Sequence, residues 1–226
     1  MKDKCPGPSG LRKKLFSNLP DNFLHNLAHI FECCLAAGYY PKQFKHAHIV
    51  FIHKAGTNKH DPLNYRPISL LNTMGKIFGK IISKKLNEYL NAHNIIKESQ
   101  HGFRSKRGVS TLLAHMYERI CREKDDKKTL ISIVHRDVSK AFDKLHKDSL
   151  IFKLSKLGLP EPLLRLLSNY LQNRTAQVKL NGKLGNVFDL MSGVPQGDIL
   201  SPILFVLMMN DYPKPLWEDN KRNFVM

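Results

Sequence analysis

Residues 137–143 read Asp-Val-Ser-Lys-Ala-Phe-Asp, and the stretch follows an apolar run rich in β-branched residues. That run predicts a strand over Leu130–Val138, so that Asp137 places a carboxylate at the end of a strand. A carboxylate in this position can bind a hard cation such as Mg²⁺, which prefers oxygen ligands and shares them with substrate phosphates. Spacing alone favours a simpler interpretation, in which Asp137 or Ser139 is the N-cap of the following helix.

Residues 193–202 form a second informative stretch, Gly-Val-Pro-Gln-Gly-Asp-Ile-Leu-Ser-Pro. The two glycines and the first proline predict a tight turn that opens onto a helix. Such a turn lets the backbone approach a ligand closely and directs the N–H groups of the helix terminus toward it. An ordinary junction between a loop and a helix explains the same residues and is favoured when the stretch is taken alone.

Residues 64–71, Asn-Tyr-Arg-Pro-Ile-Ser-Leu-Leu, form a third stretch, and a polar loop separates it from Lys54. Arg66 and Lys54 are suited to binding phosphates, the arginine as a planar fork and the lysine as a point charge. Solvated surface charge explains them equally well, because 36 Lys and Arg against 19 Asp and Glu give the chain a formal charge of +17. An excess of this size indicates a polyanionic partner, either nucleic acid or an anionic membrane surface.

The composition bounds the class of protein further. A chain of 226 residues with 42% hydrophobic and 24% charged residues can bury a real core. No apolar run approaches the length of a membrane span, and the N-terminus lacks the apolar stretch of a signal peptide. Cys5, Cys33, Cys34 and Cys121 form no C-x-x-C pair, which favours reduced cysteines. We therefore expect an intracellular protein of the nucleus or cytoplasm, neither secreted nor bound to a membrane, with nucleic acid as its partner.

Periodicity predicts an α+β fold, because helical patterns are mixed with strands and a hairpin. Helices are expected over Asp21–Leu35, Leu70–Leu90, Ser110–Cys121, Lys147–Leu157, Glu161–Leu171 and Ile199–Met209. Strands are expected over Ala47–Ile52 and Leu130–Val138, with a hairpin of Ala176–Leu180 and Asn186–Met191 around Asn181-Gly182.

Taken together and in this order, four blocks resemble the reverse transcriptases of non-LTR (LINE-type) retrotransposons, with jockey-like elements most similar. They are residues 66–69, residues 100–104 (Gln-His-Gly-Phe-Arg), residues 137–143, and residues 193–202 with Leu204-Phe205 and Asn210-Asp211. The resemblance runs from about Pro6 to the last residue. It implies the fingers and a partial palm of a right-hand polymerase, with the thumb absent. An N-terminal helical lead would span residues 1–46, and the reverse transcriptase domain residues 47–226.

The resemblance also implies roles for single residues. Asp137 corresponds to the first palm aspartate, a catalytic residue that binds both Mg²⁺ ions, and the carbonyl of Val138 is an additional ligand. Phe142 corresponds to the aromatic gate that packs where a ribose 2′-OH would lie. Gln196 belongs to the turn that contacts the incoming dNTP. Asp143 aligns with a position that is not normally a metal ligand.

Further implications concern the substrates. Arg66, and less directly Lys54, match residues that hold the triphosphate of the dNTP. Residues 100–104 match a block near the RNA template. The implied reaction is template-directed transfer of a nucleotide from dNTP to the 3′-OH of a DNA primer over RNA.

Departures from the family pattern suggest an incomplete or decayed enzyme. Such polymerases complete the metal site with an Ala-Asp-Asp motif, and the sequence contains none. Gly79 stands where glutamate is common in the family. We therefore expect residues 1–226 alone to be catalytically incomplete. A relic that binds nucleic acid without catalysis is the alternative.

Overall fold

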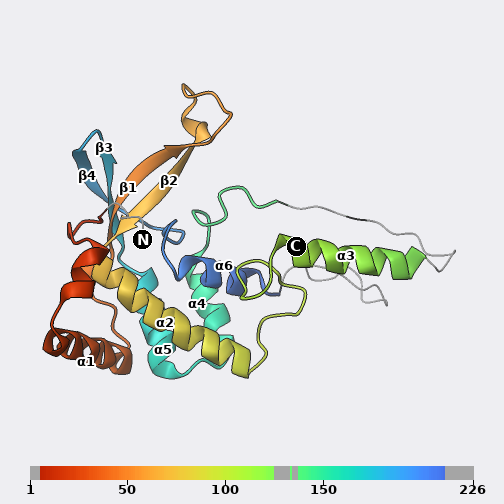
Figure 1. Ribbon diagram of the computed structural model, residues 1–226, viewed down its shortest axis with the longest axis horizontal. Helices are drawn as coiled ribbons and strands as arrows, with labels where there is room; N and C mark the ends of the chain where they lie inside the picture. The colour runs from red at the N-terminus through yellow and green to blue at the C-terminus, as the bar shows by residue number, and fades with distance from the viewer. Residues whose placement is uncertain (1–5, 125–132, 134–136, 212–226) are drawn as a thin grey trace.

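The computed structural model describes residues 6–124, 133 and 137–211, and it contains one four-stranded sheet with helices on one side (Figure 1). The strand order is β2-β1-β3-β4. β1 (His46–His53) pairs antiparallel with β2 (Tyr65–Leu71) and parallel with β3 (Thr175–Leu180). β3 forms an antiparallel hairpin with β4 (Lys183–Asp189). The mixture of helices with a small sheet confirms the predicted α+β class.

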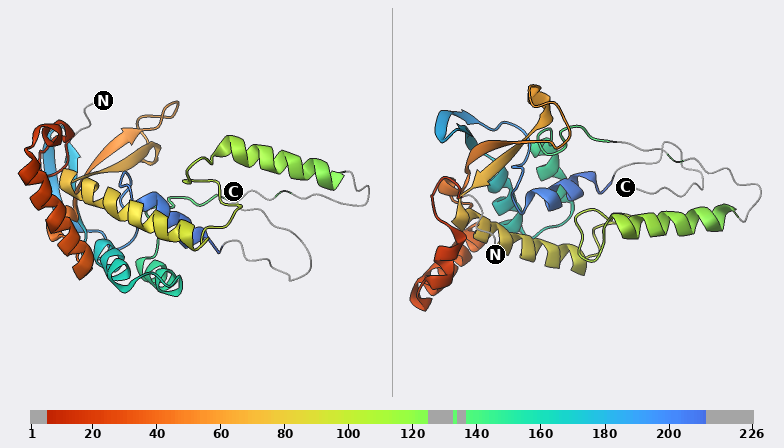
Figure 2. Two further views of the ribbon diagram at one scale, coloured as in Figure 1. Left: turned by 60° about the horizontal axis from the view of Figure 1, so that its bottom comes forward. Right: turned by 45° about the horizontal axis from the view of Figure 1, so that its top comes forward.

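The helices are α1 (Asp21–Ala37), α2 (Thr73–Ala92), α3 (Val109–Lys124), α4 (Lys147–Lys156), α5 (Glu161–Leu171) and α6 (Ser201–Met209), with 3-10 helices at Lys13–Asn18, Lys42–Phe44 and Pro62–Asn64. α2, α4, α5 and α6 gather beneath the sheet, whereas α3 extends away from the body of the molecule in every view (Figures 1 and 2). Among the described residues, no helix has the length and apolarity that a bilayer crossing requires.

The core lies where α2 meets the other helices. Phe78, Ile82, Leu86 and Leu90 are buried and recur at helical spacing, so they line one face of α2. Each buried side chain of this size contributes about 1.5–3 kcal/mol to stability. α6 is apolar around most of its circumference and is accordingly buried among the other helices. α1 joins the same core, because Phe31 stacks on Phe78 with 4.8 Å between ring centroids.

The strand β2 is the main difference from the predicted secondary structure. The sequence predicts a helix from Leu70, but Leu70 and Leu71 are the last residues of β2 and α2 begins at Thr73. The side chain of Asn72 caps α2 by accepting the Met74 N–H at 2.9 Å. Pro67 argues against a strand because it cannot donate to a ladder. β2 tolerates it because β2 is an edge strand.

The remaining elements lie close to their predicted places. α1, α3, α4, α5, β1 and the β3–β4 hairpin are confirmed to within a few residues, and α6 begins two residues after Ile199. Gly38 ends α1 with a φ of 65°, the left-handed conformation that glycine commonly adopts after the last turn of a helix. The N-cap interpretation of Asp137 and Ser139 is wrong, because His146 caps α4.

The predicted strand over Leu130–Val138 falls mostly outside the described residues. Ile133, Asp137 and Val138 are described, and none of the three is in a strand. The division of the chain after residue 46 stays a prediction.

Candidate functional site

Three segments that are distant in sequence meet at Gln196. The Ser69 N–H on β2 donates to the Gln196 carbonyl at 2.8 Å. The Gln196 side-chain Nε2 donates to both carboxylate oxygens of Asp143, at 3.0 and 3.1 Å. One residue of the predicted turn is therefore bonded through its backbone to the edge of the sheet and through its side chain to the 137–143 block.

Backbone contacts reinforce the junction between residues 193–194 and the 137–143 block. The Val194 N–H donates to the Phe142 carbonyl and the Gly193 N–H to the Leu145 carbonyl, each at 2.8 Å. Gly193 has a φ of 78°, and a Cβ there would lie 2.6 Å from the Phe142 carbonyl oxygen and 2.7 Å from that of Asp143. Only glycine fits this position, because any side chain would separate the two segments.

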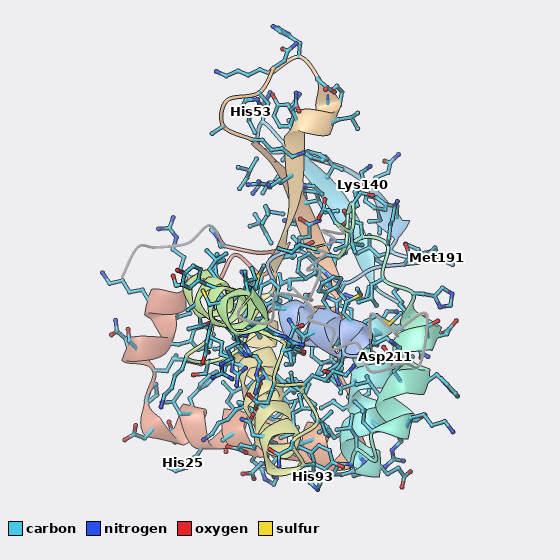
Figure 3. The ribbon with its side chains drawn as sticks, turned by 90° about the vertical axis from the view of Figure 1, so that its right-hand side faces the viewer. His25, His53, His93, Lys140, Met191 and Asp211 are labelled. Carbon is cyan, nitrogen blue, oxygen red and sulfur yellow. The ribbon has the colours of Figure 1, made fainter. Side chains whose placement is uncertain are left out.

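Phe142 brings the remaining block, residues 100–104, and helix α6 into the same region. Its ring lies 5.4 Å from the ring of Phe205 on α6 and 6.3 Å from the ring of Phe103 in the 100–104 block. All four blocks that the sequence analysis singled out therefore meet around Phe142 and Gln196. Lys140 belongs to the 137–143 block and Met191 just precedes the 193–202 block, and Figure 3 shows both on the same side of the molecule. The Ser192 Oγ adds a contact between these two blocks, because it donates to the Asp143 carbonyl at 3.1 Å.

Arg66 lies near this junction and Lys54 does not. The side chain of Ile68 faces Gly197, since a Cβ on Gly197 would lie 3.5 Å from the Ile68 Cγ2. Arg66 is exposed and shares the sheet face of Ile68, because side chains two residues apart in a strand point the same way. The Lys54 Nζ donates to the Leu63 carbonyl at 2.9 Å, within the loop of the β1–β2 hairpin, which extends away from the body near His53 (Figure 3).

Asp137 and Val138 are exposed and lie just before the turn of residues 139–143. An exposed carboxylate is a suitable ligand for Mg²⁺. The part of the chain that is described contains no group of three or more His, Cys, Asp and Glu side chains that could hold a metal. Asp143 is engaged by Gln196. Of the two carboxylates in the 137–143 block, that of Asp137 is thus available to an ion, and the described residues contain no cluster of ligands around it.

Asp198 is a residue of the turn that the sequence analysis did not single out. It is 6% exposed, and the hydroxyl of the buried Tyr170 donates to its Oδ2. Burial, and next the charge of Asp198, hold the pKa of Tyr170 well above its usual value. No local pattern marks this carboxylate as buried, because its partner Tyr170 on α5 lies 28 residues away in the sequence.

Comparison with known proteins supplies the family. A family model described as "Reverse transcriptase (RNA-dependent DNA polymerase)" matches residues 52–226. The chain belongs to the reverse transcriptase family. The resemblance to jockey-like non-LTR elements is likewise confirmed by the relatives that follow.

Two relatives from Drosophila melanogaster illustrate the match of this reverse transcriptase. The chain is 33% identical to the "RNA-directed DNA polymerase from mobile element jockey" over 93% of its own length and 23% of that protein. It is 32% identical to the "Probable RNA-directed DNA polymerase from transposon BS" over 94% of its own length and 23% of that protein. The chain therefore spans about a quarter of the length of the curated relatives it matches.

A solved structure shows the same fold. The structure of apo telomerase from Candida tropicalis, truncated from its C-terminal domain, covers 83% of this reverse transcriptase chain with a TM-score of 0.51 and 16% identity. The match covers 43% of the telomerase chain. At this identity the likeness concerns the fold alone.

Proposed function

We propose that this chain forms the dNTP-binding part of a retrotransposon RNA-directed DNA polymerase, with its fingers and part of its palm in the described residues. The meeting of Ser69, Gln196 and Asp143 carries the proposal. It joins the edge of the sheet, the 193–198 turn and the 137–143 block into one surface. Family membership supports the reaction that we propose, which is attack of a primer 3′-OH on the α-phosphate of a dNTP, with pyrophosphate leaving.

Each part of the surface has a place in this reaction. The 193–198 turn would contact the nucleotide. Within it, the Gln196 carbonyl and side chain are held in place by their hydrogen bonds to Ser69 and Asp143. Phe142 would exclude a ribose 2′-OH, and Arg66 would hold the triphosphate as a bidentate donor. Mg²⁺, when bound to Asp137 and to the carbonyl of Val138, would stabilise the charge on the attacking and leaving oxygens. A full metal site requires acidic residues in addition to the described ones.

The formal charge of +17 supports the nucleic-acid half of the proposal. Basic surface supplies most of the affinity of a polymerase for template and primer backbones, because each phosphate contact releases condensed counterions. A non-catalytic relic would keep this property as well. Binding alone therefore does not separate the two functions, whereas primer extension does.

The test is primer extension on an RNA template by a chimera in which residues 1–226 replace the matching segment of the jockey polymerase. We expect extension, and we expect Gln196→Ala to raise the KM for dNTP roughly ten- to hundredfold, because it removes a charge-assisted hydrogen bond worth about 1.5–3 kcal/mol. The control is Gln172→Ala, an exposed glutamine at the end of α5. A chimera that binds RNA but never extends a primer would contradict the polymerase and favour the relic.

A further inference from the structure

A buried polar contact connects the Gln196 turn to helix α5. Asp198 directly follows Gly197, and its carboxylate accepts from two donors. The Tyr170 hydroxyl donates to Oδ2 at 2.5 Å and the Ile199 N–H donates to Oδ1 at 2.6 Å. Asp198 is 6% exposed and Tyr170 is fully buried, so the contact is shielded from water. Hydrogen bonds to a charged acceptor are stronger than neutral ones.

Tyr170 is itself held in one orientation by its neighbours. The guanidinium of Arg174 lies 4.7 Å from the centroid of the Tyr170 ring, and its Nη1 donates to the Tyr170 carbonyl at 3.0 Å. The ring of Tyr40 packs edge-on against that of Tyr170, with 5.1 Å between centroids. Arg174 is 2% exposed. Its positive charge lowers the pKa of Tyr170, in the opposite sense to the charge of Asp198, although burial still holds that pKa well above its usual value.

The remaining bonds of the turn fix its shape but do not attach it to α5. The Asp198 N–H donates to the Pro195 carbonyl at 3.2 Å, and the Ser201 Oγ donates to the same oxygen at 2.7 Å. Gly197 has a φ of 104°, a conformation that a residue with a side chain rarely adopts. The turn is thus a rigid unit with Gln196 at its outer side and Asp198 at its inner side.

We propose that Tyr170 and Asp198 are positioning residues that hold this rigid turn so that Gln196 reaches Ser69 and Asp143. Neither residue would touch the nucleotide. Tyr170 fixes the inner side of the turn to α5, and the outer side then presents the Gln196 carbonyl and amide at hydrogen-bonding distance from their partners. The consequence for dNTP binding rests on the proposed function, whereas the consequence for the turn itself does not.

The amide of Ser69 is a direct reporter of the position of the turn. Its N–H donates to the Gln196 carbonyl rather than to β1. In an antiparallel ladder the N–H groups of successive residues point to opposite sides, so those of Ile68 and Leu70 point to β1. The hydrogen-exchange rate at residue 69 therefore reports opening of its bond to the turn, and the rates at residues 68 and 70 report opening of the β1–β2 ladder.

The experiment measures amide exchange by NMR in the 226-residue chain. Tyr170→Phe should speed exchange at Ser69, and at Gly193 and Val194, roughly tenfold, with residues 68 and 70 unchanged. The matched control is Tyr89→Phe, which removes a tyrosine hydroxyl bond to the Gly158 carbonyl of 2.6 Å, between α2 and the end of α4. An unchanged exchange rate at Ser69 in Tyr170→Phe would overturn the proposal. An equal rise of that rate in Tyr170→Phe and Tyr89→Phe would overturn it as well.

A second variant tests the pairing itself. An amide offers one acceptor oxygen, so in Asp198→Asn either the Ile199 N–H loses its acceptor or the Tyr170 hydroxyl accepts from the NH₂ group and loses its bond to a charged acceptor. In a Tyr170→Phe background the NH₂ group faces no hydroxyl. Adding Asp198→Asn there should therefore speed exchange at Ser69 less than it does in the wild-type background. Equal effects in the two backgrounds would mean that the residues act independently and would contradict the pairing.

The functional consequence is measured in the jockey chimera. Tyr170→Phe should raise the KM for dNTP severalfold while kcat and the affinity for template and primer stay near wild type, and Tyr89→Phe should leave all three unchanged. Faster exchange at Ser69 with an unchanged KM would support the positioning role and contradict the role proposed for the turn in nucleotide binding.

Discussion

Asp143 and Asp137 are close in sequence, and the structure gives their carboxylates different surroundings. The Asp143 carboxylate accepts two hydrogen bonds from the Gln196 side chain, and the expectation that Asp143 is not a metal ligand stays a prediction. Asp137 is exposed at the start of the same block. The sequence shows that both residues are acidic. It could not show which of them accepts a hydrogen bond, because the donor, Gln196, lies 53 residues from Asp143.

The two aspartates should differ in kinetic effect in the jockey chimera. Asp137→Asn should lower kcat by about two orders of magnitude or more, because it removes a proposed shared ligand of the metal ions. Asp143→Asn should mainly raise the KM for dNTP, because it acts through Gln196. Asp189→Asn, at an exposed site on β4, is the control. An Asp137→Asn chimera as fast as its parent would refute the metal-ligand assignment.

Phe142 allows a test of sugar selection. The ring is half-buried between Phe103 and Phe205, and its removal would open space beside the turn. In the chimera, Phe142→Ala should raise the incorporation of rNTP relative to dNTP while overall activity falls. Phe152→Ala, on the outer side of α4 at 63% exposure, should change neither. Unchanged discrimination would show that Phe142 serves packing only.

Gly79 illustrates how a departure from a family pattern can have a local reason. The sequence suggested decay because glutamate is common there. A Cβ on Gly79 would lie 3.2 Å from the Ile199 Cγ2 and 3.6 Å from the Asp198 Oδ1. A glutamate would therefore bring a second carboxylate close to a buried one, which is costly. Glycine at residue 79 is compatible with aspartate at residue 198.

At the scale of elements, periodicity predicted most helices and the β3–β4 hairpin but missed β2. The residues of β2 include Pro67 and lead directly into the helical pattern of α2, so the local signals indicated a loop followed by a helix. What makes Tyr65–Leu71 a strand is its pairing with β1. The parallel pairing of His46 with Thr175 could not be predicted for the same reason, since no local pattern relates residues so far apart.

The boundary between β2 and α2 can be tested through its cap. Asn72→Ala removes the acceptor of the Met74 N–H and should lower the free energy of unfolding of the 226-residue chain by about 1 kcal/mol. Urea denaturation measures the change. Asn186→Ala, at an exposed position in β4, is the control and should have little effect. A loss no larger than that of the control would mean that α2 does not begin at this cap.

At the scale of the whole molecule, the order of the four blocks predicted the family, and the fold brings those blocks together. The sequence could not predict that Phe142 and Gln196 lie at the centre of this arrangement. Their partners lie on β2, in the 100–104 and 137–143 blocks and on α6, which are far apart in the sequence. The two-metal site stays a prediction, since the described residues contain no cluster of ligands.

The charge of the molecule makes a prediction about nucleic-acid binding by the 226-residue chain. Log affinity for RNA should fall steeply and linearly with log salt, with little preference among sequences, because a formal charge of +17 favours phosphate contacts. Fluorescence anisotropy with two unrelated RNA oligonucleotides across a salt series measures both properties. Binding that is insensitive to salt would contradict an electrostatic interface.

The most direct measurement of the central claim is photo-crosslinking of an azido derivative of dATP to the jockey chimera with primer and RNA template bound, followed by mass spectrometry. If the surface joined by Ser69, Gln196 and Asp143 binds the nucleotide, the label should map to peptides containing residues 193–198 or Phe142, and unlabelled dATP should compete for it. Labelling confined to other segments, or labelling that dATP does not displace, would contradict the account.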